Sequence, residues 1–183
     1  MTTTRILPLV IGCLLLAPFS AHGQDAPARQ GFWFSLGGGV GSHGVSCESC
    51  IGSVRETGFT TSFRVGGTFS PQVTLGADLS AWVKPLDDPG RGEYAFMGAL
   101  MGEAQLYLKP GSGLFLLAGG GYVVDVVDDD LVLDTPGIVV GGGYDIRTGR
   151  GFSITPTFKY FRTLDGGNLT SSLYQFGLSA TWH

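Results

Sequence analysis

The chain has 183 residues and a formal net charge of −4; only 14% of its residues are charged, and 31 are glycine. Binding of nucleic acid needs a basic surface, so this charge balance argues against nucleic acid as a partner. Beyond the first 23 residues there is no run of about 20 predominantly apolar residues, which argues against a membrane-spanning helix. A chain so poor in charge and rich in glycine nevertheless suggests a protein whose surroundings are not entirely water.

The first 23 residues predict a secretory signal peptide. An arginine precedes the apolar residues 6–17, and small residues at 21–23 offer a cleavage site. Cleavage there leaves residues 24–183, a length that fits one domain. A lipoprotein signal ending at Cys13 is the less favoured alternative, because it would leave three leucines as an apolar stub after the anchor.

Alternation of apolar and polar residues recurs along the rest of the chain. In residues 59–69 the apolar side chains of Phe59, Phe63 and Phe69 fall on one face and Arg64 on the other. This period of two predicts β-strands with two unlike faces. Eight such segments are long enough to cross a membrane as tilted strands. They are residues 32–41, 59–69, 73–84, 96–108, 114–126, 138–147, 152–162 and 174–182.

The predicted connections alternate between short and long. The short ones carry proline or glycine, and the long ones are more polar, which matches the periplasmic turns and external loops of outer-membrane barrels. We therefore predict an all-β fold, an eight-stranded antiparallel up-and-down transmembrane β-barrel with both termini on the periplasmic side. A two-sheet sandwich is the alternative. It gives the same alternation, but its apolar side chains point inward and its charges outward. The short connections are 70–72, 109–113 and 148–151, and the long ones are 42–58, 84–93, 127–137 and 163–172.

Charged residues give an independent test of these faces, because the faces were assigned from apolar residues. The charged side chains are predicted to point into the barrel and to leave the outer face free of charge. Counting from Pro71 places Arg64 opposite Asp78, within reach of a cross-strand pair. Four cations and four anions can neutralise one another, so we expect a plugged interior rather than a narrow pore. The alternative is that they face trapped water without specific pairing. The set is Arg64, Asp78, Lys84, Glu103, Asp125, Asp145, Arg147 and Lys159.

Pro156 falls on the outer face of the seventh predicted strand. Proline cannot donate to the ladder, and a closed barrel has no free edge where this would be harmless. We therefore expect a β-bulge at this position.

The stretch GVGSHG matches the G-x-G-x-x-G pattern of dinucleotide sites at Gly39, Gly41 and Gly44. That pattern requires a following helix and an acidic residue about 20 positions later at the end of a second strand. No helical period follows, and Glu56 falls among predicted loop residues. Similar glycine runs recur at 119–121 and 141–143, so we interpret the glycines as strand residues that make room inside a narrow barrel and expect no cofactor.

These features together resemble the small outer-membrane barrels of the OmpA and OmpX type. The resemblance rests on the signal peptide, the eight alternating strands, the GGGV and GGGY strands and the ending YQFGLSATWH. It implies a monomer in the outer membrane of a Gram-negative bacterium, in contact with membrane lipid and lipopolysaccharide. It also implies recognition of the last strand by the barrel-assembly machinery, for which Trp182 is the nearest terminal aromatic. Barrels of this size serve adhesion, anchoring and lipid A modification alike.

Two cysteines, Cys47 and Cys50, fall in the first predicted external loop. An oxidising compartment favours a disulfide between them. Together with His43 they could instead contribute to a metal site, but no fourth ligand is evident, so no metal is expected. Unpaired thiols are the third alternative.

The predicted loop at 127–137 belongs to an acidic stretch from Asp125 to Asp134. It lacks the spacing and the central glycine of an EF-hand. A solvated loop is the main interpretation, and a divalent cation bridging the loop to lipopolysaccharide is the alternative.

An enzyme is the alternative to a structural or surface-interaction barrel. A lipid A hydrolase or acyltransferase needs a nucleophile, a base and an orienting acid. His43 could be the base, with Ser42 or Ser46 as nucleophile and Asp87 or Asp88 as acid. No motif of such an enzyme is present, so no catalytic residue is assigned.

Overall fold

The computed structural model describes residues 29–47, 54–85, 94–127, 130–148, 151–164 and 169–183. The predicted signal peptide lies outside these ranges. No helix within them is long and apolar enough to cross a membrane. Their regular structure consists of the strands β1 (Phe32–Cys47), β2 (Val54–Ser70), β3 (Val73–Pro85), β4 (Tyr94–Tyr107), β5 (Leu114–Val127), β6 (Asp130–Tyr144), β7 (Ile146–Arg147), β8 (Phe152–Thr163) and β9 (Leu169–Trp182).

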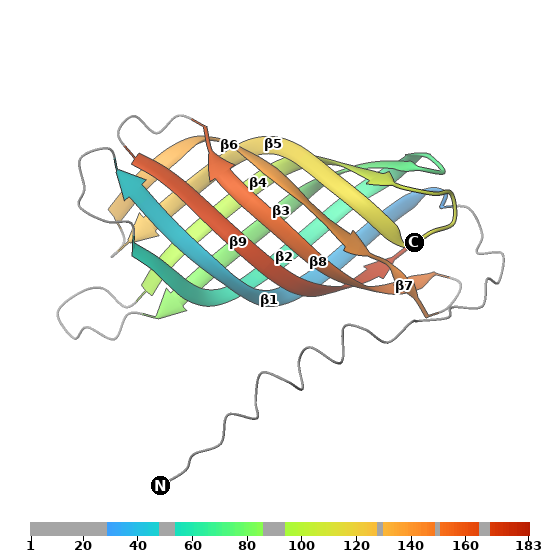
Figure 1. Cartoon of the computed structure of the whole chain (residues 1–183), viewed down its shortest axis with the longest axis horizontal. Coiled ribbons are helices and arrows are strands. Elements are labelled where there is room, and N and C mark those ends of the chain that lie inside the picture. Colours follow the sequence, from blue (N-terminus) through green and yellow to red (C-terminus); the bar gives the residue numbers. More distant parts are fainter. Residues whose placement is uncertain (1–28, 48–53, 86–93, 128–129, 149–150, 165–168) are drawn as a thin grey trace, which may run out of the picture.

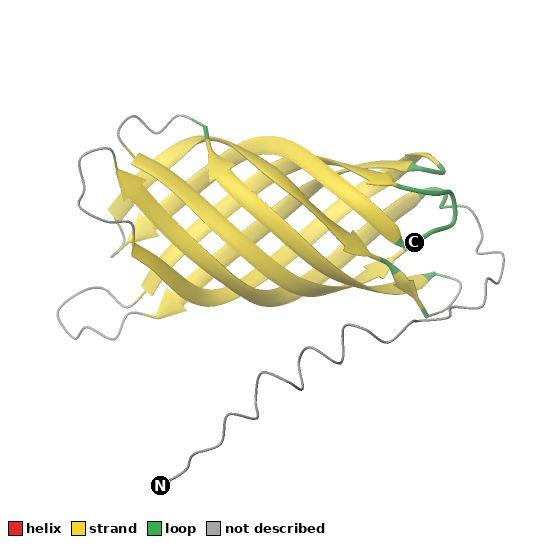
Figure 2. Ribbon diagram, viewed as in Figure 1, coloured by secondary structure: helices red, strands yellow, loops and turns green. Residues whose placement is uncertain are grey.

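The strands form one closed antiparallel sheet (Figures 1 and 2). Apart from β6 and β7, strands that follow each other in the chain are neighbours in the sheet. β1 pairs with β9, and the pairing of β6 with β8 completes the ring. The short β7 continues the line of β6, so the wall consists of eight strands. This confirms the predicted eight-stranded up-and-down barrel and excludes the two-sheet sandwich.

The two ends of the barrel differ. We call the end with the short β2–β3 and β4–β5 turns the turn end; the C-terminus lies there too (Figure 1). The β4–β5 turn reverses at Gly111, whose φ of +78° is a conformation that glycine adopts without strain. We call the opposite end the loop end.

Several strands continue further toward the loop end than the sequence predicted. The expected loops 42–58, 127–137 and 163–172 are wrong in extent, because β1 runs to Cys47, β2 begins at Val54, β6 at Asp130 and β9 at Leu169. Apolar alternation marks only the part of a strand whose outer face meets an apolar medium. Backbone pairing continues wherever both neighbouring strands are present, so the hydrogen-bonded ladder extends beyond the residues that show the hydrophobic pattern.

The bulge expected at Pro156 is not formed. The pairs Gly143↔Thr157 and Ile146↔Ile154 are in the same register, so no residue is inserted between them. The partner strand is instead interrupted between β6 and β7 at Asp145. The Asp145 N–H donates to the Gly113 carbonyl on the other side. The missing proline donor is thus accommodated by a gap in the neighbouring strand.

The two faces of the sheet follow the predicted alternation. Phe59 is 66% exposed on the outer face, whereas the next residue, Thr60, is 2% exposed in the lumen. One part of the prediction is wrong, because the outer face is not free of charge. Arg55, Asp134 and Arg162 point outward, all near the loop end. In a transmembrane barrel the cost of an outward charge falls toward the membrane surface, so outward charges near the loop end are compatible with the predicted fold.

Candidate functional site

The middle of the lumen contains a buried ion cluster. The Lys159 ammonium donates to the Asp78 carboxylate and, at 3.0 Å, to Glu103 Oε1. These residues come from β8, β3 and β4, and each is at most 5% exposed. Because β8 is not a neighbour of β3 or β4 in the sheet, the lysine reaches across the lumen. We call Lys159, Asp78, Glu103 and Arg64 the central cluster.

Glycines make room for the central cluster. Lys159 lies opposite Gly141 in the register, and Glu103 lies opposite Gly119. A Cβ at Gly141 would overlap the Phe158 carbonyl oxygen, and one at Gly119 would overlap a backbone oxygen of β4. Two of the glycine runs in the sequence therefore leave lumen volume that the long charged side chains fill.

Arg64 lies opposite Asp78, as the count from the turn predicted. The expected ion pair between them is not what the geometry shows. The Arg64 guanidinium donates to Ser179 Oγ at 3.2 Å and to Ser35 Oγ at 3.4 Å, while Asp78 accepts from Lys159. The sequence fixes which residues are opposite on neighbouring strands, but it does not reveal contacts made across the lumen.

A second cluster closes the turn end. The Arg29 guanidinium lies 3.3 Å from the centre of the Tyr107 ring and donates to Asp145 Oδ2 at 3.2 Å and to the Ser112 carbonyl at 2.7 Å. Asp145 also accepts from Tyr107 at 2.8 Å and from Thr155 at 2.9 Å. The sequence interpretation overlooked Arg29 because it precedes the first strand. An inward Asp145 without an assigned cation was the signal that could have indicated it.

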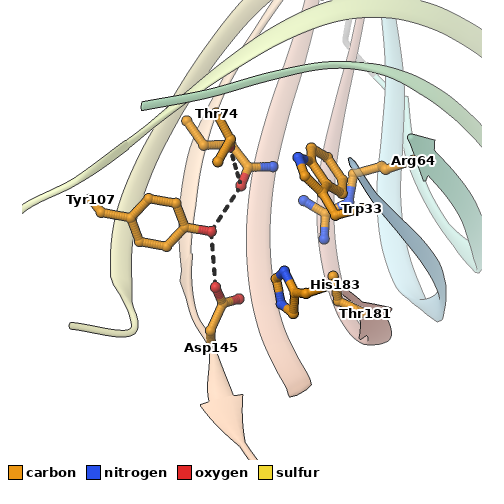
Figure 3. Close-up of a pocket in the computed structure, with 8 residues that line it drawn as sticks. Trp33, Arg64, Thr74, Tyr107, Asp145, Thr181 and His183 are labelled. Carbon is orange, nitrogen blue, oxygen red and sulfur yellow. Dashed lines mark hydrogen bonds between the residues drawn. The ribbon is translucent and has the colours of Figure 1, made fainter. Parts of the chain in front are cut away.

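Figure 3 shows how Tyr107 and Asp145 meet at the edge of a small pocket between the central cluster and the turn end. His183 lines the same pocket, and its Nε2 lies 3.2 Å from Ser153 Oγ. Burial lowers the pKa of the His183 imidazole below its ordinary value. Polar side chains line the rest of the pocket, including Thr74, Gln105 and Thr181.

Two further members of the predicted set, Lys84 and Arg147, lie at the ends of the lumen. Lys84, near the loop end, is partly exposed and pairs with Glu56 at 3.0 Å. Glu56 is thus a strand residue of β2 rather than the loop residue that the sequence suggested. Arg147, in β7 at the turn end, is also only partly buried.

The loop end of the lumen holds His43, Ser171 and Asp125, which we call the loop-end cluster. His43 Nε2 lies 2.9 Å from Ser171 Oγ and 3.1 Å from Asp125 Oδ1, and its ring packs 4.7 Å from that of Trp82. Neither Asp125 oxygen accepts a hydrogen bond, although the residue is only 2% exposed. Asp125 is therefore a buried carboxylate that meets the His43 ring at ion-pair distance but without hydrogen-bond geometry.

The structure does not bring together the catalytic residues that the sequence suggested around His43. Ser42 and Ser46 lie on β1 beside His43, so their side chains point to the opposite face of the sheet. Asp87 and Asp88 lie outside the described residues. In the loop-end cluster the serine and the carboxylate both approach Nε2, whereas a relay needs the acid on the other ring nitrogen.

The cysteine predictions lie beyond what the structure describes. Cys47 ends β1, but its side chain is not described, and Cys50 falls in the gap at 48–53. Within the described ranges no group of three histidine, cysteine or acidic side chains could hold a metal ion.

Comparisons with solved structures place this architecture among known folds. The neisserial surface protein A is similar with a TM-score of 0.60 and 15% identity, covering 82% of this chain and 97% of that one. The attachment invasion locus protein Ail of Yersinia pestis gives 0.52 and 11%, covering 83% and 99%. OprG of Pseudomonas aeruginosa gives 0.51 and 12%, covering 87% and 100%.

The likeness extends over nearly the whole of each of these structures, at identities that show the fold alone. No protein-family model matches the sequence, and no curated protein matches it. The closed eight-stranded sheet and the three comparisons agree, and the chain therefore has the fold of the small outer-membrane β-barrels.

Proposed function

We propose that the chain is a monomeric outer-membrane barrel with a closed lumen, which acts at the cell surface and within the surrounding lipid rather than as a pore. The observation that carries this proposal is Lys159, which reaches across the lumen to Asp78 and Glu103. A charged group this deeply buried is stable only when it is paired, so the cluster favours one closed arrangement.

Two further layers support closure. On the loop side of the central cluster, apolar side chains fill the lumen, among them Met97, Met101 and Phe161, each at most 1% exposed. On the turn side, Arg29 and Tyr107 cover the lumen between Asp145 and the β4–β5 turn. An eight-stranded barrel encloses little more space than its own side chains need.

The outer face supports a membrane location. Large apolar side chains are exposed around the ring. Near the turn end Trp182 stacks on Phe34 and meets Phe152 edge-on. Such a band with aromatic edges is typical of outer-membrane barrels, which place short turns in the periplasm and longer loops outside. In this orientation β9 would present Trp182 to the assembly machinery, and the loop end faces the outside.

The names of two similar structures support a role at the surface. One is a surface protein, and the other is an attachment invasion locus protein that was also solved with the heparin analogue sucrose octasulfate. We propose that this chain likewise engages an external partner or the membrane surface through its loop end.

Planar-bilayer recording of the refolded barrel tests the closed lumen. The wild type should give no steady channel current. The double variant Lys159→Ala/Glu103→Ala removes one cation and one anion from the central cluster and should give intermittent current. The matched control is Lys84→Ala/Glu56→Ala, which removes an equally balanced pair from the partly exposed end and should leave the barrel closed.

A steady current through the wild type would contradict the closed lumen. So would equal currents through the two double variants, because closure would then not depend on the central cluster. Heat-modifiable migration on gels checks in each case that the protein in the bilayer is folded.

A further inference from the structure

The outer face of β8, β9, β1 and β2 is ordered in rows that run around the barrel. The register aligns Phe158, Phe176, Val40 and Phe59 in an apolar row, and two residues nearer the loop end it aligns Tyr160, Tyr174, Ser42 and Thr57 in a tyrosine row. Two residues further it aligns Arg162, Ser172, Gly44 and Arg55 in an arginine row. Successive rows are about 7 Å apart along the strands. The outward chemistry thus changes from hydrocarbon through phenol and hydroxyl to guanidinium.

Arg55 is held in a fixed position in the arginine row. Its guanidinium donates to the Ser42 carbonyl at 2.6 Å, to Ser42 Oγ at 3.3 Å and to Ser172 Oγ at 3.0 Å, and it lies 4.5 Å from the centre of the Tyr174 ring. It reaches Ser172 by crossing β1 above Gly44. A Cβ at Gly44 would lie 2.8 Å from Arg55 Cγ. This glycine of the GVGSHG stretch therefore leaves the path that the arginine follows.

The crossing brings two cations together. Ser172, which accepts from Arg55, is the direct cross-strand neighbour of Arg162. Neighbouring strands are about 4.8 Å apart, so the Arg55 guanidinium ends next to the strand that carries Arg162. Arg162 is exposed and makes no hydrogen bond or ion pair with the residues that the structure describes.

No carboxylate balances this pair on the described outer face. Among the side chains that the structure describes, Asp134 is the acidic one that points outward. It lies four residues beyond Ile138, the β6 partner of Arg162, which is about 13 Å along the strand. Among the side chains that the structure describes, the arginine row at the edge of this apolar surface therefore has no carboxylate close to it.

We propose that the arginine row binds a phosphate group of an outer-leaflet lipid. Guanidinium groups bind phosphate through charge-assisted and often bidentate hydrogen bonds. No described residue occupies the donors of Arg162, while Arg55 adds a positioned charge and Ser172 a hydroxyl. The order of the rows selects a lipid as the source of the phosphate, because apolar and tyrosine rows directly below match acyl chains and the interface.

This inference rests on the proposed membrane location. It can be tested with the full folded chain in nanodiscs of phosphatidylcholine that contain a small fraction of lipid A, with native mass spectrometry counting the lipid A retained. The wild type should retain bisphosphorylated lipid A at least about tenfold better than dephosphorylated lipid A. Arg55→Gln/Arg162→Gln should lose this preference. Lys109→Gln removes an exposed cation at the turn end and should keep it.

Equal retention of the two lipids by the wild type would overturn the proposal, as would a preference that survives in the double arginine variant. Displacement of lipid A by millimolar inorganic phosphate would show a general anion site and overturn the assignment to lipid. Bilayer recordings on the same preparations separate this result from the closed lumen, because a conducting barrel that still prefers phosphorylated lipid A would contradict only the proposed function.

Discussion

Charged side chains occupy two unlike regions of this molecule, the lumen and the outer face near the loop end. In the lumen, Lys159 is matched by two carboxylates. On the outer face, Arg55 and Arg162 have no carboxylate nearby among the side chains that the structure describes. A charge in the lumen is surrounded by protein and must find its partner there, whereas a charge at the edge of a bilayer can be neutralised by water, ions or lipid phosphate. The comparison suggests that inward charges stabilise the barrel and outward charges position it.

The lumen itself is not uniform. Asp78 accepts hydrogen bonds from Lys159 and Ser80, whereas Asp125 in the loop-end cluster accepts none. Both carboxylates are at most 2% exposed. Burial alone therefore does not distinguish them, and the difference in partners should appear in their contributions to stability.

The largest effect is expected for Lys159→Met. It leaves Asp78 and Glu103 buried without their cation and should lower the free energy of unfolding by about 3–5 kcal/mol, measured in urea with the protein in lipid vesicles. Adding Asp78→Asn and Glu103→Gln should recover much of the loss. The control Lys84→Met breaks a partly exposed pair and should cost less than about 1 kcal/mol. Equal losses in Lys159→Met and Lys84→Met would mean that pairing in the lumen does not stabilise the fold.

A smaller effect should separate the two buried aspartates. Asp78→Asn removes the negative charge and one of the two oxygens that accept from Lys159 and Ser80, and it should cost about 1.5–3 kcal/mol. Asp125→Asn neutralises a buried carboxylate that accepts no hydrogen bond, and it should change stability by less than about 0.5 kcal/mol or increase it. The same urea titrations compare the two. A loss in Asp125→Asn as large as that in Asp78→Asn would show that the contact with His43 stabilises the loop end.

The sequence predicted the ring of strands and which side chains point into the lumen, because both depend on the local alternation of apolar and polar residues. It placed Arg64 opposite Asp78 because a short turn sets the register. It could not predict that Asp78 binds Lys159, since that contact spans the lumen between strands that are not neighbours. Arg29 was missed for a similar reason, because it enters the barrel from a segment with no strand pattern.

The arginine row was missed because the strands were predicted from apolar alternation. Arg55 and Ser172 fall where apolar alternation has faded, so they were assigned to loops, although the ladder continues through both. Arg162 belonged to a predicted strand and has the same parity as Phe158, so its outward direction could have been read from the sequence. Its convergence with Arg55 depends on a side chain that crosses β1, which no pattern along one strand encodes.

A small change in stability is also expected for Gly44→Ala, which distinguishes a positioned cation from a merely present one. The new Cβ would displace Arg55 and weaken its bonds to Ser42 and Ser172, while both arginines stay in the chain. Exposed hydrogen bonds contribute little, so unfolding should change by no more than about 1 kcal/mol.

Retention of bisphosphorylated lipid A by Gly44→Ala should nevertheless fall severalfold in the nanodisc measurement. Gly38→Ala is the matched control, because it places the same methyl group on the outer face of β1 where the nearest atom is 3.6 Å away. If both variants retain lipid A like the wild type, the charge of the arginines is enough for retention and the position of Arg55 is not needed. If only Gly44→Ala loses it, the glycine that mimics a nucleotide motif positions an arginine for phosphate on the outside of the barrel.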